Sequence, residues 1–354
     1  MGFGHRRDRA IVRIVDFKVQ PRTVSGRARN AHGAFTERTS WLVRVRTASG
    51  AVGEGEAAPL PGYSPDRPED VADYLRSWAG STVVLEPDGV RVWPVLPQDT
   101  PPSAVFALEQ AILTAAAREQ GLELREVLGG IPGQPVPVQS LLDDPRTAPT
   151  GARVALRQGV RTFKLKVSGA RDLKDQLLGY REAVEHGART TGVSLDRVRL
   201  RLDANGTLGP GWEERVVGCL PAAEWVEEPV KAAAAVLPSA GPIPWALDES
   251  LVAADPARFD QATEVLGGFV LKPTLLGGFR QCMRWHDLAR RLGVPVCVSH
   301  CYEIGPGFRG AVDLAAALQR PGEVHGLFPH SFLDTEASVQ DGSVETNQTE
   351  DLRP

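Results

Sequence analysis

The sequence is poor in cysteine and methionine, and it has no long apolar run. It contains four cysteines and two methionines in 354 residues, and no two cysteines form a C-x-x-C pair. This spacing disfavours a disulfide framework or a zinc site and predicts reduced, buried thiols. No apolar stretch approaches the ~18 residues of a membrane-spanning helix, and no apolar signal region follows the charged start at Met1 to Ala10. We therefore expect a cytoplasmic protein with no membrane partner.

An excess of either charge is also missing. Forty Lys and Arg residues oppose 44 Asp and Glu residues, which leaves a net charge of −4 and an isoelectric point near 6.0. A chain without a net positive field is not expected to bind nucleic acid. The composition, with 42% hydrophobic residues, 28 prolines and 36 glycines, is typical of a globular protein, and the length favours one large domain or two unequal ones.

Residues 1–133 mix strand-like and helical patterns, which predicts a compact α+β domain. The second of its helices is expected to use Ser103 as its N-cap and to end at Gly121. The glycines and prolines of residues 53–64 are expected to exclude regular structure there. The expected elements are strands over residues 11–19 and 41–46 and helices over residues 68–78 and 103–120.

Residues 134–332 have a different texture, because short apolar runs recur, each ends in a polar residue and helical signals separate several of them. Strands that alternate with helices at a spacing of ~20–36 residues predict a parallel sheet, and eight such units predict closure into a barrel. One connecting helix is expected over residues 278–292. The eight runs are Val136 to Leu142, Thr162 to Val167, Val198 to Asp203, Glu224 to Glu227, Pro244 to Asp248, Gly268 to Lys272, Pro295 to Ser299 and Val324 to Phe328.

The last residues, 333–354, form a polar segment. Acidic side chains outnumber basic ones in it, and apolar periodicity is missing. We expect a mobile tail that is not needed for folding.

Lysines close two of the predicted strands. Lys164 and Lys166 alternate around Leu165, so both ammonium groups are expected on one side of their strand, where one lysine should lower the pKa of the other. Alone, such a pair is more typical of the solvated face of an edge strand. At the carboxyl end of a barrel strand, where active sites of this architecture lie, it predicts a catalytic role. Lys272 closes the strand that is expected to lie across the barrel mouth.

Carboxylates close the three strands between these lysines. Asp203, Glu227 and Asp248 each follow an apolar run, at separations that bring all three to one rim. Taken alone, each carboxylate also fits a structural role: Asp203 fits an Asx-turn, Glu227 a surface charge and Asp248 a helix N-cap. Together, without His or Cys, they form a hard oxygen site that suits Mg²⁺. Glu228 is the alternative to Glu227, but Glu227 shares the face of Trp225 and is preferred.

A divalent ion between two opposed lysines is suited to removing a proton α to a carboxylate, because the cation stabilises the charge that develops and a lysine accepts the proton. The Lys-Leu-Lys, Leu-Asp-Ala-Asn, Glu-Glu-Pro, Leu-Asp-Glu-Ser-Leu and Leu-Lys-Pro-Thr-Leu-Leu-Gly-Gly segments, in this order, resemble the muconate-lactonizing branch of the enolase superfamily. The resemblance spans nearly the whole chain. It implies a modified (β/α)7β barrel of the TIM type over residues 134–332, an N-terminal α+β capping domain over residues 1–133, and a separate tail over residues 333–354.

The resemblance also implies roles for individual residues. Asp203, Glu227 and Asp248 correspond to Mg²⁺ ligands, with Mn²⁺ as a substitute, Lys166 to the base and Lys272 to the opposed lysine. Further substrate contacts are expected within these motifs and at the end of the seventh barrel strand, from Lys164, Arg201, Asn205 and Ser299. The neighbours of Ser299, which are His300, Cys301 and Tyr302, depart from the family pattern.

The segment over residues 53–64 resembles the capping-domain loop of o-succinylbenzoate synthases, which are lyases of menaquinone biosynthesis. This resemblance implies dehydration of 2-succinyl-6-hydroxy-2,4-cyclohexadiene-1-carboxylate to 2-succinylbenzoate. N-acylamino acid racemisation and dipeptide epimerisation stay open as alternatives, because they use the same metal and lysines. In each case the partner is a small carboxylate substrate, and the sequence leaves the oligomeric state open.

Two alternative functions, a dinucleotide-binding enzyme and a non-catalytic ligand-binding protein, are disfavoured. Residues 305–310 fit the G-x-G-x-x-G pattern of dinucleotide-binding proteins, but they stand too late in the chain for a second nucleotide-binding half to follow. In a barrel this segment opens the last helix, where its backbone N–H groups are expected to hold a substrate carboxylate. A ligand-binding descendant without activity is disfavoured because all five expected metal and lysine residues are present.

Overall fold

The structure is a computed structural model of the whole chain. It describes residues 12–30, 33–85, 91–169, 171–220, 223–259, 264–334 and 336–346. The expectations for Met1 to Ala10 and for the last eight residues lie outside this part of the chain.

An antiparallel sheet and two long helices form the N-terminal part, as predicted for an α+β domain. The strands have the order β3-β2-β1-β4, and α2 packs across β3 and β2. Both expected helices are confirmed, but α2 begins at Pro102, so Ser103 is not its N-cap. The Ser103 hydroxyl instead donates a hydrogen bond of 2.5 Å to Asp66. The elements are β1 (Val12–Asn30), β2 (Gly33–Thr47), β3 (Val52–Ala57), α1 (Pro68–Ser77), β4 (Val83–Leu85), α2 (Pro102–Glu119) and α3 (Leu124–Leu128).

The expectation that residues 53–64 lack regular structure is wrong for their first part. Strand β3 covers Val52–Ala57 and pairs antiparallel with β2. Its glycines are needed for close approach rather than for a turn, because a Cβ on Gly53 or Gly55 would lie 1.9 Å from the carbonyl oxygen of Ala111 or Ala107 on α2. The irregular segment therefore begins at Ala58, and residues 58–64 are called the capping loop below.

A parallel sheet of seven strands forms the second part of the described chain, in the order β12-β11-β10-β9-β8-β7-β6. Chain neighbours are sheet neighbours, as repeated βα units require. Each observed strand overlaps one of the first seven predicted runs. The strands are β6 (Gln139–Leu142), β7 (Thr162–Lys166), β8 (Arg199–Asp203), β9 (Ala223–Glu227), β10 (Trp245–Leu247), β11 (Leu266–Leu271) and β12 (Val296–Val298).

The eighth predicted run closes the sheet through isolated bridges rather than as a regular strand. His325 bridges Val138 beside β6, and Gly326 bridges Ser299 beside β12. The His325 N–H donates to Pro137 O at 2.8 Å, and the Gly326 N–H donates to Val298 O at 2.8 Å. The two edges of the sheet are thereby joined, and the predicted fold class is confirmed.

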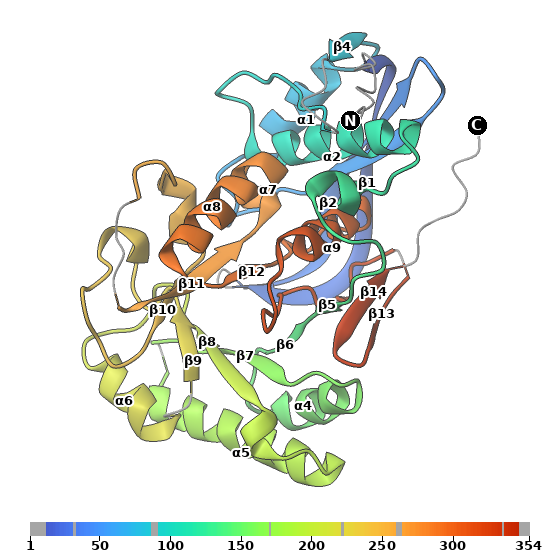
Figure 1. Cartoon of the computed structure of the whole chain (residues 1–354). Coiled ribbons are helices and arrows are strands. Elements are labelled where there is room, and N and C mark those ends of the chain that lie inside the picture. Colours follow the sequence, from blue (N-terminus) through green and yellow to red (C-terminus); the bar gives the residue numbers. More distant parts are fainter. Residues whose placement is uncertain are drawn as a thin grey trace, which may run out of the picture.

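Helices cover the outside of this barrel, and Figure 1 shows α4, α5 and α6 at the end of the molecule far from α1 and α2. Helix α2 packs against α7 and α8, which joins the two parts of the chain. The predicted helix over residues 278–292 is confirmed as α8. The remaining helices are α4 (Ala148–Arg157), α5 (Leu173–Thr191), α6 (Trp212–Cys219), α7 (Pro273–Leu276), α8 (Gly278–Leu292) and α9 (Pro306–Leu318), with short 3-10 turns at Leu195–Arg197, Ala233–Ala235 and Glu249–Ala253. No helix in the described part of the chain is both long and apolar enough to cross a membrane.

The prediction of a mobile polar tail is wrong for residues 337–346. They form a hairpin of β13 (Ala337–Gln340) and β14 (Ser343–Thr346), and β14 pairs antiparallel with β5 (Val136–Pro137) at the start of the barrel. Val339 and Val344 are buried in the barrel core. Ala337 packs against the same core while half-buried. So few apolar side chains in a mostly polar segment gave no strand signal in the sequence.

Candidate active site

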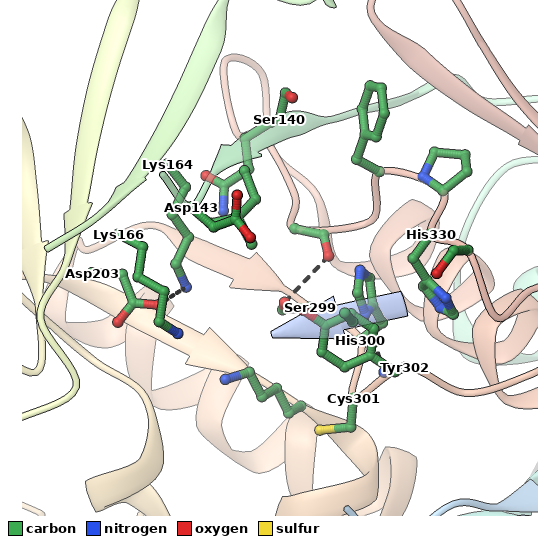
Figure 2. A pocket seen from close by; sticks show the side chains of 18 of the residues that line it. Ser140, Asp143, Lys164, Lys166, Asp203, Ser299, His300, Cys301, Tyr302 and His330 are labelled. Carbon is green, nitrogen blue, oxygen red and sulfur yellow. Dashed lines mark hydrogen bonds and ion pairs between the residues drawn. The ribbon is translucent and has the colours of Figure 1, made fainter. Parts of the chain in front are cut away.

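A cavity of about 490 Å³ lies at the carboxyl ends of the barrel strands, where they meet the N-terminal sheet and the capping loop. Figure 2 shows Lys164, Lys166 and Asp203 on one wall and the residues from Ser299 to Tyr302 on the opposite wall. Its lining draws on segments from residue 27 to residue 331 of the chain. The lining residues used below are Arg27, Leu60, Tyr63, Asp143, Lys164, Lys166, Asp203, Asn205, Lys272, Ser299, His300, Cys301, Tyr302 and His330.

Lys164 and Lys166 both face the cavity, as alternation along β7 predicts, but they differ in their contacts. Lys164 Nζ lies 3.0 Å from Asp203 Oδ2 and also pairs with the Glu227 carboxylate. Although burial opposes its charge, these two carboxylates raise the pKa of Lys164 well above its usual value. Burial lowers the pKa of Lys166, and the nearby ammonium groups of Lys164 and Lys272 lower it further. The expected lowering of one lysine's pKa by the other is therefore found at Lys166.

Lys272 follows β11 and lies against the capping loop. Its Nζ is 2.5 Å from Asp248 Oδ2 and donates a hydrogen bond of 2.6 Å to the Tyr63 hydroxyl. Burial opposes the charge here too, but Asp248 and Glu249 raise the pKa of Lys272 above its usual value. Tyr63 belongs to no sequence motif of its own, and its place in the Gly- and Pro-rich segment is its only signal in the sequence.

Three buried carboxylates stand at the ends of adjacent strands. Asp203 ends β8, Glu227 ends β9 and Asp248 follows β10, with exposed fractions of 5%, 0% and 3%. Although burial raises it, the ammonium groups of Lys164 and Lys166 lower the pKa of Asp203 to about 2. Asp203 is therefore charged throughout the neutral range.

The choice between Glu227 and Glu228 follows from their contacts. The Glu227 carboxylate faces Lys164 inside the barrel. Glu228 turns away, with a left-handed φ of 40°, and its carboxylate accepts hydrogen bonds from the backbone N–H groups of Asp248 (2.8 Å) and Ser250 (3.1 Å). Glu228 thus shapes the turn after β10, and Glu227 is the carboxylate that lies beside Asp203.

The donor set of Asp203, Glu227 and Asp248 suits a hard divalent cation, because it is all oxygen and carries three negative charges. In this structure the ammonium groups of Lys164 and Lys272 lie between these carboxylates and compensate their charge. In the described residues, no three His, Cys, Asp or Glu side chains are grouped closely enough to hold a metal ion. The residue types fit Mg²⁺, and loading would require both ammonium groups to withdraw.

Of the four residues expected to contact substrate, Lys164, Asn205 and Ser299 line the cavity and Arg201 does not. Arg201 lies deeper on the same face of β8 as Asp203 and is 2% exposed. Its guanidinium donates to Gln139 Oε1 at 2.7 Å and lies 3.8 Å above the Trp225 ring. Arg201 therefore fills the barrel interior below the site, and its expected substrate contact is corrected.

The opposite wall carries aromatic residues to which the sequence motifs assigned no role. His300, Tyr302 and His330 form an aromatic cluster, with ring centroids 4.6 Å apart for His300 and His330 and 5.0 Å apart for His300 and Tyr302. Burial lowers the pKa of His330 to about 3 and that of His300 well below its usual value. Both imidazoles are therefore neutral, and this wall is an uncharged aromatic surface.

The G-x-G-x-x-G segment at residues 305–310 does not face the cavity. The carboxylate of Glu56 on β3 accepts the backbone N–H groups of Ile304 (2.7 Å), Gly305 (2.9 Å) and Gly307 (3.0 Å) at the start of α9. A side chain of the N-terminal sheet thus occupies the place that the sequence analysis assigned to a substrate carboxylate. The segment joins the two parts of the chain, and its expected role in binding is corrected.

Comparisons with known proteins agree with this arrangement. Residues 149–350 match the family model described as enolase C-terminal domain-like. The chain is 30% identical over 317 residues to an N-succinylamino acid racemase of Thermus thermophilus, a match that covers 84% of this chain and 81% of that protein. It is 25% identical over 341 residues to an o-succinylbenzoate synthase of Desulfotalea psychrophila, over 85% of this chain and 89% of that protein.

A solved structure has the same fold. The dipeptide epimerase from Methylococcus capsulatus, complexed with Mg and the dipeptide L-Arg-D-Lys, matches with a TM-score of 0.74 and 23% identity, over 95% of this chain and 98% of that one. The family match alone covers more than half of the sequence. The chain is therefore an enzyme of the enolase superfamily.

Proposed function

We propose that the cavity removes a proton α to a substrate carboxylate, with Asp203, Glu227 and Asp248 holding Mg²⁺ and with Mn²⁺ as a substitute. The main support for this proposal is that three buried carboxylates lie close to Lys166 and Lys272 at the carboxyl ends of the barrel strands. When bound, the cation would stabilise the negative charge that develops on the substrate carboxylate. The withdrawal of Lys164 and Lys272 from the carboxylates would accompany its binding.

Lys166 is the base in this proposal. In the described part of the chain its Nζ makes no hydrogen bond or ion pair, whereas the ammonium groups of Lys164 and Lys272 are held by carboxylates. Burial also lowers the pKa of Lys166, which favours the neutral amine that a base requires. Its Nζ takes the α-proton as the C–H bond breaks, and the electron pair moves toward the substrate carboxylate. Lys272 contributes a positive charge that stabilises this electron pair.

The first candidate reaction is that of an o-succinylbenzoate synthase. In it, Lys166 returns the proton to the leaving hydroxyl group, so that water departs and 2-succinylbenzoate forms for menaquinone biosynthesis. The capping-loop segment and a 25% identical relative named o-succinylbenzoate synthase support it. Lys272 then needs only to stay charged, which agrees with its raised pKa.

Racemisation of an N-succinylamino acid is the second candidate. It is supported by a relative of that name, which is 30% identical over 84% of this chain. The two candidate substrates share a succinyl group and an acidic α C–H bond. They differ in the demand on Lys272, because a racemase needs proton transfer from both lysines.

The test compares both reactions in the Mg²⁺-loaded enzyme in D₂O. We expect Lys166→Ala to abolish both, and Lys272→Arg to retain more dehydration than racemisation, because arginine keeps the charge but does not readily exchange a proton. Lys174→Ala, which changes an exposed lysine on α5, is the matched control and should behave as the wild type.

The outcome separates the candidates. If the wild type inverts an N-succinylamino acid, with deuterium incorporation, at a kcat/KM well above that for the cyclohexadiene, the racemase replaces the synthase. Full activity of Lys166→Ala on both substrates would refute proton removal by this lysine altogether.

A further inference from the structure

We propose that Arg38 is a positioning residue, whose single guanidinium holds the capping loop and the loop after β12 in one fixed relation and so sets two walls of the cavity together. The inference rests on the proposed function only in taking this cavity as the active site. Neither the sequence motifs nor the expected catalytic residues include Arg38.

Arg38 lies on β2 and is 2% exposed. On the side of the capping loop, its Nη1 donates to Pro59 O at 2.6 Å and its Nη2 donates to Ala58 O. On the side of the barrel, its Nη2 donates to Cys301 O at 3.0 Å and its Nε donates to Tyr302 O at 3.2 Å. A fifth hydrogen bond, of 3.2 Å, goes to Thr39 O on its own strand.

All five acceptors are backbone carbonyl oxygens. A guanidinium paired with a carboxylate would fix another side chain, whereas one bound to carbonyl groups fixes the path of the main chain. The carboxylates of Glu303 and Glu56 interact with the Arg38 guanidinium only by through-space electrostatics. Because a buried cation is stable only when its donors are satisfied, both loops must keep their places around Arg38.

The two loops it joins carry cavity residues. The capping loop continues from Pro59 to Leu60 and to Tyr63, which contacts Lys272. The other loop presents Cys301 and Tyr302 to the same cavity.

Tyr302 also has a left-handed φ of 60°. Such a conformation costs a non-glycine residue about 1 to 3 kcal/mol and persists only when its surroundings enforce it. The hydrogen bond from Arg38 Nε to the Tyr302 carbonyl is one of the contacts that enforce it.

Lysine cannot replace this arrangement. The planar fork of arginine spreads five N–H groups over three nitrogens, whereas the three N–H groups of lysine share one atom. One ammonium cannot reach four carbonyl groups on two different loops. The Arg38→Lys substitution therefore keeps the charge and most of the volume but removes the connection.

Hydrogen exchange measured by mass spectrometry on the Mg²⁺-loaded enzyme reads this connection directly. The amides of Tyr63 and Ser64 donate to Leu60 O, and that of Cys301 donates to the Glu303 carboxylate, so their exchange reports opening of each loop. In Arg38→Lys we expect faster exchange in residues 60–64 and 301–304 together, with α2 unchanged. Arg44→Ala, which removes a half-exposed arginine from the same strand, should leave both segments as in the wild type.

Kinetics supply the second readout. Misplacing both walls should lower kcat/KM by about a hundredfold in Arg38→Lys, with kcat reduced as well as KM raised. In Arg38→Ala, added guanidinium should restore part of kcat/KM, and it should have no such effect on Arg44→Ala.

Three results would overturn the inference. They are faster exchange in one loop only or in neither, unchanged kcat and KM in a folded Arg38→Lys protein, and failure of Arg38→Lys to fold, which would assign Arg38 to the stability of the whole chain. If the wild type turns over neither candidate substrate, the proposed function fails, and the exchange comparison still decides the role of Arg38.

Discussion

Glu109 should make the stability of the protein depend on pH, and Glu109→Gln should remove that dependence. The residue lies on α2, is 4% exposed, and accepts the backbone N–H of Arg280 at 3.1 Å at the start of α8. It thus joins the N-terminal helix to the barrel. Burial raises its pKa to about 7 from a usual value of 4.5, against the opposing effect of the backbone N–H groups that it accepts.

The sign follows from proton linkage. A carboxyl group with a raised pKa binds its proton more tightly in the folded state, so its contribution to stability is fully present below pH 4.5 and is lost as the pH rises toward 7. With 1.36 kcal/mol for each pKa unit, the total loss is about 3 kcal/mol. A glutamine at this position keeps a neutral acceptor for the Arg280 N–H and does not titrate.

Reversible urea unfolding at pH 5, 6, 7 and 8 measures the difference. The free energy of unfolding of Glu109→Gln minus that of the wild type should rise by about 2.5 kcal/mol from pH 5 to pH 8, because part of the total loss already occurs below pH 5. All other titrating groups are shared and cancel. Parallel stability curves for Glu109→Gln and the wild type would refute the reasoning.

Three further expectations concern the metal, the hairpin and β3. EDTA should abolish activity and Mg²⁺ should restore it, while Asp248→Asn should weaken Mg²⁺ binding in calorimetric titration and lower kcat by about a hundredfold or more; full activity of the metal-free protein would contradict this. Deleting residues 337–354 should lower the free energy of unfolding by at least about 3 kcal/mol, because Val339 and Val344 leave the core; an unchanged Tm would contradict the packing of the hairpin. Gly55→Ala should destabilise the protein by about 3 kcal/mol in urea unfolding, since its Cβ would lie 1.9 Å from Ala107 O, whereas Gly50→Ala meets no neighbouring atom and tests only the strain of its positive φ.

The barrel and its charged rim could be predicted from the sequence because both depend on local patterns. Each barrel strand is a short apolar run, and the catalytic architecture places polar side chains where such runs end. Lys164, Lys166, Asp203, Glu227, Asp248 and Lys272 were found in this way. Lys164 lies within β7, and the other five lie at or directly after the ends of β7 to β11. Side-chain alternation also separated Glu227 from Glu228, because the two neighbours must face opposite ways.

The alternation of side chains along a strand predicts which face a residue occupies, but it does not predict how deep in the barrel that residue lies. Arg201 and Asp203 share one face of β8, yet Asp203 reaches the cavity while Arg201, two residues earlier, lies in the layer below it. The packing of side chains inside the closed barrel decides which of the two reaches the cavity.

Contacts between distant segments were likewise decided by the tertiary structure. In the sequence, Gly53 and Gly55 look like turn glycines, but in the structure α2 packs directly against them. Glu56 looks like a surface charge in the sequence, but in the structure it accepts a backbone N–H group at the start of α9. Val339 and Val344 are too few to mark a hairpin in a polar segment. They pair with each other across the hairpin, and the hairpin is held on the barrel by the pairing of β14 with β5. The sequence thus determined the barrel, its rim of charges and the class of chemistry they support, because those follow from local periodicity. The closure of the sheet through isolated bridges instead of a regular eighth strand, the aromatic wall and the hydrogen bonds around Arg38 arise from packing between residues far apart in the chain, which no local pattern records.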